Sequence, residues 1–341
     1  MEKIRALKNC FSIGSIVIKG NVISAPMAGI TDLPFRLRAK QGGASLVYSE
    51  MLSAKALEQH HERTKKMLEI SGEERPVAVQ IFGGSEDTMR NAAMHVQEAG
   101  ADILDINLGC PVKKVCKSGS GMALLKSEEN LIKILRSVIK SVQIPVTVKM
   151  RIGLTPDAVI APHVCSVAEQ EGIAAVVIHA RPASNMHKGP AYWDAVARAV
   201  NKVKIPVIAN GGICDGKSAV DIMKYTGCAG VMIGRAAIGD FTIFNRIQHY
   251  INTSEQLPSP APAEKIETFK DHLQDLCSFY GETMGIRRMR KIIPAYFKEL
   301  PDAASIRNHL MHCTTIDGVK GCITSISVFI VLIKVLDQYF L

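Results

Sequence analysis

Short apolar runs alternate with longer segments of helical spacing along the first two thirds of the chain. The runs are rich in Val, Ile and Ala and lack polar alternation, which is typical of strands buried on both faces of a parallel sheet. Closing eight such strands into a ring removes unpaired edges. The pattern therefore predicts a (β/α)8 TIM barrel, with strands at Val22–Ala28, Leu46–Glu50, Val77–Phe82, Ile103–Leu108, Val146–Arg151, Ala175–Arg181, Pro206–Asn210 and Gly230–Arg235.

Two of the helical segments carry clear boundary signals. Ser85 is expected to cap a helix that ends at Gly100, and Ser127 is expected to cap a helix that ends before Pro145. Both helices would connect consecutive parallel strands, as a barrel requires.

The repeating pattern stops between Asn252 and Ala263, where Pro258, Pro260 and Pro262 indicate a linker. Beyond it the spacing is helical, so the predicted fold class is α/β, a barrel followed by a small C-terminal all-helical domain. We place the barrel at residues 1–252, the linker at 253–262 and the helical domain at 263–341. The apolar run 328–333 is much shorter than the ~20 residues of a membrane span, and we interpret it as a buried helix of the last domain.

Composition narrows the class of protein. The 341 residues suffice for one large core and a smaller unit, and 5% aromatic residues make that core mainly aliphatic. The formal net charge of +9 suits a polyanionic partner such as nucleic acid, although it also suits an ordinary basic surface. The nine cysteines include no pair with zinc-finger spacing, so we expect no metal, reduced thiols, and a cytoplasmic protein without a secretory signal or membrane segment.

Candidate chemistry lies where the predicted strands end, because barrels of this kind place their sites there. The last two strand ends offer closely approachable backbone N–H groups and a guanidinium, at the position where barrels commonly hold a phosphate. In chain order the ends carry Pro26-Met27-Ala28, Glu50, Gln80, Asn107 with Cys110, Lys149 with Arg151, His179 with Arg181, Asn210-Gly211-Gly212, and Gly234-Arg235.

Two of these residues have more than one interpretation. Lys149 lies in an apolar strand and is suited to a Schiff base, to placing positive charge beside an electron-rich ring, or to pairing with a carboxylate. Cys110 precedes a basic, glycine-rich loop whose cations would favour the thiolate. The alternative for Cys110 is a buried structural thiol.

Together these segments resemble the tRNA-dihydrouridine synthases, with the bacterial B-type branch the nearest. The resemblance rests on Ala25-Pro26-Met27-Ala28-Gly29-Ile30-Thr31-Asp32, Asn107-Leu108-Gly109-Cys110-Pro111, Val148-Lys149-Met150-Arg151, Ile178-His179-Ala180-Arg181, Ala209-Asn210-Gly211-Gly212-Ile213 and Gly234-Arg235-Ala236. It continues into the tail at Met289-Arg290-Lys291 and Leu300-Pro301.

The resemblance implies FMN as cofactor, held by Pro26, Met27, Ala28, Gln80, Lys149, Asn210, Gly211, Gly212, Gly234 and Arg235. Lys149 would then stabilise negative charge on the reduced flavin ring. NADPH or NADH would reduce the flavin, a hydride would pass to C6 of a uracil ring, and Cys110 would protonate C5. A thiol suits this role because its pKa lies near working pH.

The resemblance also implies a folded RNA substrate whose uridine is extruded into the barrel mouth. Asn107, His179 and Arg181 are candidates to hold the base. Two basic clusters are candidates to contact phosphates, Lys113, Lys114 and Lys117 near the mouth and Arg287, Arg288, Arg290 and Lys291 in the tail.

Some positions depart from the family's usual pattern. Pro182-Ala183 follows Arg181 where Thr-Arg is usual, and Gly212 stands where Asp is more usual. Pro294 is expected to bend the helix after Lys291. These differences concern substrate contacts more than flavin contacts.

Three other functions are also compatible with these residues. One is a flavin barrel that reduces a free pyrimidine, as a dihydroorotate dehydrogenase does; a basic mouth and a helical tail argue against it. The second is a Schiff-base aldolase centred on Lys149, and the third is a non-catalytic RNA-binding protein. We expect a monomer, since barrel and tail would clamp the RNA together.

Overall fold

The computed structural model describes residues 9–298, 300 and 302–324, so the helix expected at 328–333 lies outside the described residues. The chain divides into two compact units. The first comprises Met1–Gly234 and Ile243–Leu257, and the second comprises Arg235–Thr242 and Pro258–Leu341.

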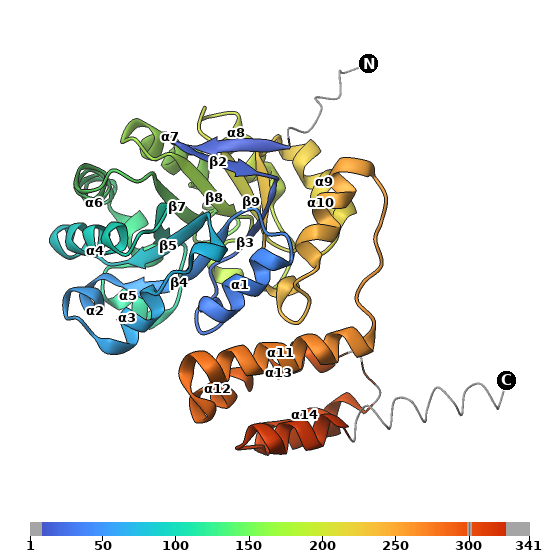
Figure 1. Cartoon of the computed structure of the whole chain (residues 1–341). Helices are drawn as coiled ribbons and strands as arrows, with labels where there is room; N and C mark the ends of the chain where they lie inside the picture. The colour runs from blue at the N-terminus through green and yellow to red at the C-terminus, as the bar shows by residue number, and fades with distance from the viewer. Residues whose placement is uncertain (1–8, 299, 301, 325–341) are drawn as a thin grey trace. The chain divides into compact units, whose positions relative to one another are not determined.

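Eight parallel strands form the centre of the first unit (Figure 1), in the order β3-β10-β9-β8-β7-β6-β5-β4. The two ends of this order meet at a parallel bridge between Ile23 and Leu46, where Ser24 N–H donates to the Leu46 carbonyl at 2.9 Å. The predicted eight-stranded barrel is therefore confirmed. Its strands are β3 (Val22–Ser24), β4 (Val47–Ser53), β5 (Val77–Phe82), β6 (Ile103–Leu108), β7 (Val146–Arg151), β8 (Ala175–His179), β9 (Val207–Asn210) and β10 (Gly230–Ile233).

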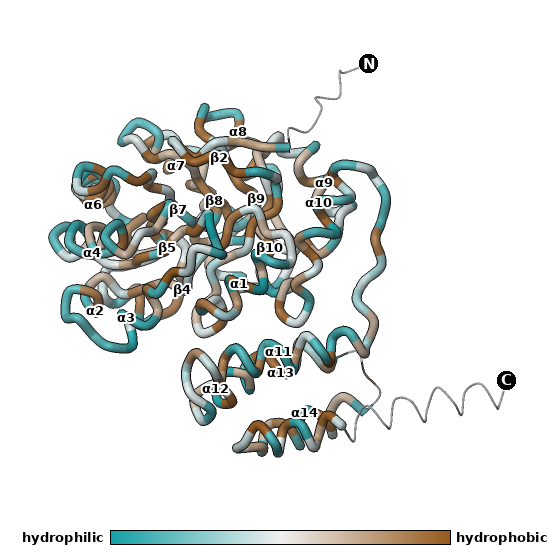
Figure 2. The backbone as a smooth tube through the Cα atoms, viewed as in Figure 1, coloured by the Kyte–Doolittle hydropathy of each residue, from teal (hydrophilic) through white to brown (hydrophobic). Residues whose placement is uncertain are grey.

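Helices cover the outside of this ring (Figure 1). They are α1 (Leu33–Gln41), α2 (Ala54–Glu58), α3 (Glu62–Leu68), α4 (Glu86–Glu98), α5 (Lys113–Lys117), α6 (Glu128–Ser141), α7 (Ala161–Gln170), α8 (Trp193–Val200), α9 (Gly216–Thr226) and α10 (Ile243–Thr253). Short 3-10 turns are η1 (Gly72–Glu74), η2 (Gly121–Lys126) and η3 (Ala183–Asn185). In Figure 2 the hydrophobic colour gathers on the central strands, while the outer helices alternate between hydrophobic and hydrophilic positions.

The two expected caps differ in how they work. Ser127 accepts a bond from Asn130 N–H at 3.3 Å and so caps α6 with its side chain. Ser85 also precedes its helix, but its side chain makes no capping bond, and its carbonyl instead accepts from Met89 N–H at 3.1 Å. The position was predicted correctly, whereas the side-chain cap at Ser85 was wrong.

A hairpin that the sequence pattern did not predict precedes the barrel. Its strands β1 (Cys10–Ile13) and β2 (Ile16–Lys19) pair antiparallel. Ile13 and Ile18 are fully buried in one cluster with Ile103 and Ala175, the first residues of β6 and β8. The hairpin therefore covers the N-terminal end of the barrel with apolar side chains, which leaves the C-terminal strand ends for polar chemistry.

The second unit is helical in its described part. It contains η4 (Arg235–Ala237), α11 (Pro262–Tyr280), α12 (Glu282–Met289), α13 (Ile293–Phe297) and α14 (Ala303–His312), followed by helical residues 316–324. Phe269 packs edge-on against Tyr296 and Phe297 in its core. Pro294 does not bend one long helix, as was expected: it lies in the first turn of α13, where its missing N–H is not needed. No helix within the described ranges has the length and apolar character of a membrane span.

Candidate active site at the C-terminal ends of the barrel strands

Polar side chains from three neighbouring strands meet inside the barrel, toward the C-terminal ends of the strands. Side chains alternate along a strand, so Asp105 and Asn107 share one face of β6, and Thr147 and Lys149 share one face of β7. The register pairs Gln80 with Asp105, Asp105 with Thr147, and Asn107 with Lys149. The register thereby brings the polar side chains of three otherwise apolar strands together in one cluster inside the barrel.

Hydrogen bonds connect the members of this cluster. Gln80 Nε2 donates to Asp105 Oδ2 at 2.7 Å, and the Thr147 hydroxyl donates to Asp105 Oδ1 at 2.6 Å. Asn107 Nδ2 donates to Gln80 Oε1 at 2.8 Å. Burial raises the pKa of Asp105 to about 6, and the Thr147 and Gln80 bonds oppose that rise. Asp105 is thus a carboxylate at pH 7 that has been removed from solvent.

Cys110 lies just beyond the end of β6, on a turn held from two sides. Asn107 Oδ1 accepts from the N–H groups of Gly109 at 3.1 Å and Cys110 at 2.9 Å. Arg151 Nε donates to the Gly109 carbonyl at 3.1 Å. Burial raises the pKa of the half-buried Cys110 thiol, and Arg151 opposes this rise only in part. The thiol therefore keeps its proton at neutral pH, although the basic loop had pointed toward thiolate.

Lys149 and Asn210 link β7 to β9 and β10 by hydrogen bonds. Lys149 Nζ donates to Asn210 Oδ1 at 3.3 Å, and Asn210 Nδ2 donates to the Met232 carbonyl on β10 at 2.8 Å. Burial and the charge of Arg151 lower the pKa of Lys149 to about 8, while Asp105 opposes the change. An ammonium with this pKa is largely charged at pH 7 and can also release its proton within reach of physiological pH.

Arg151 ends β7, and His179 ends the neighbouring strand β8. Arg151 Nη1 donates to the carbonyls of Pro182 at 3.2 Å and Met186 at 2.5 Å, which ties the loop after β8 to β7. Burial, reinforced by the charges of Lys149 and nearby arginines, lowers the pKa of His179 to about 2. Its imidazole is therefore neutral, and a neutral ring can donate one hydrogen bond and accept another.

Glycines shape the ends of β9 and β10. Gly211 has φ +127° and Gly212 has φ +80°, and a Cβ at Gly211 would lie 2.9 Å from Cδ2 of His179. A side chain there would close the space that the backbone leaves open. A Cβ at Gly234 would lie 3.8 Å from Met27 Sδ, so the loop at Pro26, Met27 and Ala28 adjoins the end of β10. The cradle formed by these glycines suits a bound phosphate, because glycine lets backbone N–H groups approach an anion closely.

The predicted site residues are distributed unevenly. The first unit brings Gln80, Asn107, Cys110, Lys149, His179, Arg181, Asn210 and the three glycines to one set of strand ends. Lys113, Lys114 and Lys117 are exposed on α5, directly after Cys110. Arg235 follows β10 but belongs to the second unit.

The tail cations split into two kinds. Arg287 and Lys291 are exposed, as expected for phosphate contacts. Arg288 lies over the ring of Tyr280 at 4.2 Å, and Arg290 Nη2 donates to the Cys313 carbonyl at 2.9 Å. These last two side chains are therefore used inside the second unit.

Sequence reasoning missed two residues of the internal polar cluster, Asp105 and Thr147, and it missed the connecting role of Arg151. A signal for Asp105 was present, because a carboxylate in the middle of an apolar strand is rarely buried without a partner. The partners themselves lie on two other strands and have no local signature.

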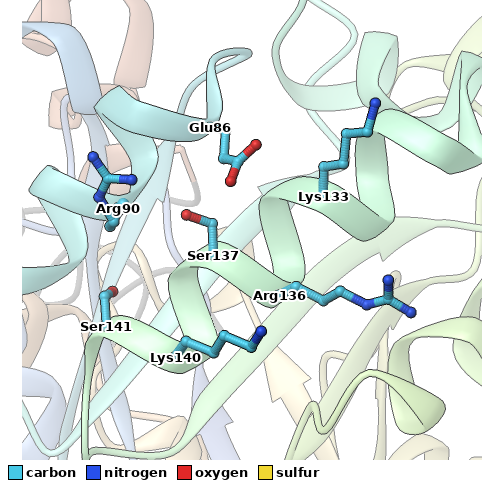
Figure 3. A pocket seen from close by; sticks show the side chains of 7 residues that line it. All are labelled: Glu86, Arg90, Lys133, Arg136, Ser137, Lys140 and Ser141. Atoms are coloured by element: carbon cyan, nitrogen blue, oxygen red, sulfur yellow. The ribbon is translucent and has the colours of Figure 1, made fainter.

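Two of the surface hollows of the first unit can be compared. One, of about 590 Å³, adjoins the strand ends and is lined by Arg181, Gly211, Gly212, Trp193 and Tyr225 together with Ala191, Ser218, Asp221 and Ile222. The other lies between α4 and α6 on the outer wall, and Figure 3 shows the four cations among its seven lining residues. Three of them already have carboxylate partners, Arg90 with Asp87, Lys133 with Glu129 and Arg136 with Glu171.

Comparison with known proteins adds to this geometry. A family model described as "Dihydrouridine synthase (Dus)" matches residues 23–329. The chain is 40% identical over 295 residues to "tRNA-dihydrouridine synthase B" of Pseudomonas syringae, covering 86% of this chain and 88% of the relative. It is 38% identical over 306 residues to the protein of the same name from Xanthomonas axonopodis, covering 90% and 92%.

Solved structures share the fold at low sequence identity. The old yellow enzyme of Trypanosoma cruzi matches with a TM-score of 0.52 at 12% identity, covering 76% of this chain and 95% of that chain. The amine oxidase HisD of Pseudomonas geniculata matches with a TM-score of 0.57 at 13% identity, covering 77% and 54%. These likenesses concern the barrel architecture alone.

Proposed function

This chain is an enzyme of the dihydrouridine synthase family, and we propose that it reduces uridines of tRNA to 5,6-dihydrouridine with FMN as cofactor and NADPH as reductant. The observation that carries the proposal is Cys110. A protonated thiol stands just beyond a strand end, on a turn whose backbone is held by Asn107 and Arg151. A proton donor at the same end of the barrel as a lysine and a glycine-lined cradle suits the reduction of an activated double bond.

The residues of the strand ends fit FMN. Gly211, Gly212 and Gly234 leave backbone N–H groups accessible at the ends of β9 and β10, which suits its phosphate. Lys149 supplies positive charge, and Gln80 supplies an amide edge from β5. Pro26, Met27, Ala28, Asn210 and Arg235 complete the proposed set. When bound and reduced by NADPH, FMN supplies the hydride that C6 of the uracil ring accepts.

Cys110 supplies the matching proton. Its Sγ–H bond breaks as a proton passes to C5, and the resulting thiolate takes a proton from solvent. Arg181 and neutral His179 donate hydrogen bonds to the uracil carbonyls as negative charge develops there. The raised pKa keeps the donor loaded at neutral pH, and Arg151 near Cys110 stabilises the thiolate afterwards.

Basic side chains attract the RNA, and one extruded uridine then reaches the site. Lys113, Lys114 and Lys117 on α5 and the exposed Arg287 and Lys291 contact phosphates, while one uridine leaves its stack and enters the barrel mouth. We further propose that the helical tail from residue 263 is the RNA-binding domain and that the protein acts as a monomer in the cytoplasm.

One experiment tests the central proposal. The purified protein should show flavin absorption that bleaches with NADPH without oxygen and returns when unmodified tRNA is added, with dihydrouridine formed. Cys110→Ala should still bleach but should lose the tRNA-dependent step by about 100-fold or more. A colourless protein that consumes no NADPH would contradict the proposal, and recovery of the flavin bands with free uridine instead of tRNA would favour a free-pyrimidine reductase.

A further inference from the structure

A chain of hydrogen bonds runs from a buried carboxylate to the backbone of Cys110. We propose that Asp105 is a positioning residue for the Cys110 acid and acts through the side chains of Gln80 and Asn107. This inference rests on the proton-donor role proposed for Cys110.

Four hydrogen bonds make up the chain. Gln80 Nε2 donates to Asp105 Oδ2 at 2.7 Å, and Asn107 Nδ2 donates to Gln80 Oε1 at 2.8 Å. Asn107 Oδ1 then accepts from the backbone N–H groups of Gly109 at 3.1 Å and Cys110 at 2.9 Å. The path joins β5 and β6 to the turn that presents the thiol.

The ends of the chain determine the orientation of both amides between them. A backbone N–H can only donate, so Asn107 must turn its oxygen toward Cys110 and its nitrogen toward Gln80. Gln80 must then turn its oxygen toward Asn107 and its nitrogen toward position 105. That position therefore has to carry an acceptor, and a carboxylate can act only as one.

Stability does not explain a carboxylate at this position. Asp105 is fully buried and Gln80 is 1% exposed, so the charge has lost its solvation. Burial raises the pKa of Asp105 to about 6, which means that burial disfavours the charged form. The charged or titratable groups around it are Tyr48 on β4 and Lys149 on β7. An apolar side chain would avoid this penalty, so the carboxylate has to be explained by what it orients.

The N–H groups of the turn at Cys110 depend on this chain, because Asn107 Oδ1 is their acceptor. The carbonyls of the turn are held from elsewhere: Arg151 Nε donates to the Gly109 carbonyl at 3.1 Å, and Met122 N–H donates to the Cys110 carbonyl at 3.2 Å. If Gln80 loses its acceptor, its amide can rotate and present N–H to the Asn107 amide nitrogen. Asn107 then loses its orientation, and the Cys110 backbone loses its acceptor.

The test measures the two half-reactions of the full-length, flavin-loaded protein separately. Asp105→Val removes the acceptor and should slow tRNA-dependent flavin reoxidation about 10- to 100-fold, as a small misplacement of a reacting group does. Its flavin reduction by NADPH needs no proton from Cys110 and should slow less than reoxidation does, although Asp105 also acts on Gln80 and Lys149, which we propose to hold the flavin. Asp105→Asn keeps an acceptor oxygen for Gln80 and can donate to the Thr147 hydroxyl, so it should restore reoxidation to within about threefold of wild type.

Thr147→Val is the matched control. It removes the other hydrogen bond to Asp105, at 2.6 Å, and leaves the Gln80 bond in place. It should leave reoxidation within about threefold of wild type. An equal slowing by Thr147→Val and Asp105→Val would mean a general loss of packing and would overturn the proposal.

Reversing the donor and acceptor directions of the hydrogen-bond chain provides a second test, which needs no apolar substitution. Asn107→Asp places a carboxylate on each side of Gln80, and one amide nitrogen cannot satisfy both. Adding Asp105→Asn supplies a donor at the far end, so Gln80 can turn around and the chain can form again. The double variant should reoxidise at least about tenfold faster than Asn107→Asp alone. If the double variant is no faster, the proposed positioning role of Asp105 is wrong.

Testing Asp105→Val in proteins with and without the Cys110 thiol separates this inference from the proposed function. In Cys110→Ala, followed over hours, Asp105→Val should change the remaining reoxidation by less than about threefold, because no thiol is left to position. A wild-type protein that forms no dihydrouridine would overturn the proposed function. If wild type forms dihydrouridine, Cys110→Ala is impaired and Asp105→Val is not, then the positioning role of Asp105 is wrong while the proposed function stands.

Discussion

Replacing Glu74 with alanine tests a buried ion pair beneath the first helix of the barrel. Glu74 accepts from Arg36 Nε at 2.5 Å and from Nη2 at 3.2 Å, and the two side chains are 0% and 1% exposed. The variant leaves the guanidinium buried with the carbonyls of Thr31 and Glu69 as its remaining acceptors. Removing one partner of a buried pair costs about 3–5 kcal/mol, far more than a surface pair is worth.

A second contribution comes from the short turn η1. Glu74 Oε1 also accepts from Ser71 N–H at 2.9 Å, and losing this capping bond adds about 1 kcal/mol. We therefore expect Glu74→Ala to lower the free energy of unfolding of the first unit by about 4–6 kcal/mol. That is a large part of the total, since domains are stable by about 5–15 kcal/mol.

Urea denaturation followed by tryptophan fluorescence measures this loss. Trp193 is the single tryptophan and begins α8 in the same unit as the ion pair. Asp221→Ala is the control: its partner Lys217 is 74% exposed, and the change should cost less than about 1 kcal/mol. Arg36→Met combined with Glu74→Ala should recover part of the loss, because no charge stays buried.

Two outcomes would contradict this explanation. A loss below about 1 kcal/mol in Glu74→Ala would mean that solvent reaches the guanidinium. A double variant less stable than Glu74→Ala alone would mean that packing, and not the buried charge, is the cause. Arg36 also holds the Thr31 carbonyl, and the Thr31 hydroxyl accepts from Met27 N–H at 3.0 Å, so we expect weaker flavin retention as well.

Three further predictions concern the site and the tail. Lys149→Met should stabilise the protein by about 1–3 kcal/mol at pH 7 while impairing flavin reduction. Because burial lowers the pKa of Lys149 to about 8, the cost of burying its charge is present below pH 8 and declines as the pH rises from 8 toward the pKa of an unfolded lysine. The difference in unfolding free energy between Lys149→Met and wild type, measured by urea titration, should therefore narrow over that window. A difference that widens would contradict the assignment. Gly211→Ala should weaken FMN binding about 10-fold or more, measured by fluorescence titration, whereas Gly172→Ala, with φ +97° and no atom closer than 3.9 Å, should reduce stability and leave FMN affinity unchanged. Replacing Arg287 and Lys291 with alanine should reduce the slope of log binding constant against log salt by about 0.7–0.9 for each phosphate that these side chains neutralise, and an unchanged slope would exclude both from the RNA interface.

Much of the barrel could be predicted because its signals are local. The bounds of β5, β6 and β7 match the apolar runs residue for residue, since strands buried on both faces must be apolar throughout. Strands β8 and β10 end earlier than expected, because Arg181 and Gly234 already belong to the loops that face the site, whereas β9 ends at Asn210 as expected. Sequence reasoning also located most candidate site residues, because the barrel rule places them at strand ends.

The hairpin at β1 and β2 shows where local signals failed. Its strands are four residues long, and their burial depends on contact with the first residues of β6 and β8, about 90 and 160 positions away. The tail arginines show the same limit. Arg287 and Arg290 look alike in sequence, yet Arg290 donates to the Cys313 carbonyl and Arg287 faces solvent.

Patterning along the chain was enough to predict the number of barrel strands, the strand ends at which the candidate site lies, and the thiol, lysine and glycines that stand there. The protonation of Cys110, the neutral state of His179 and the network around Asp105 became visible only once the strands were assembled. The physical reason is that hydrophobic periodicity is set by neighbours along the chain. Burial, hydrogen-bond polarity and pKa are set by strand register between segments 25 to 61 residues apart.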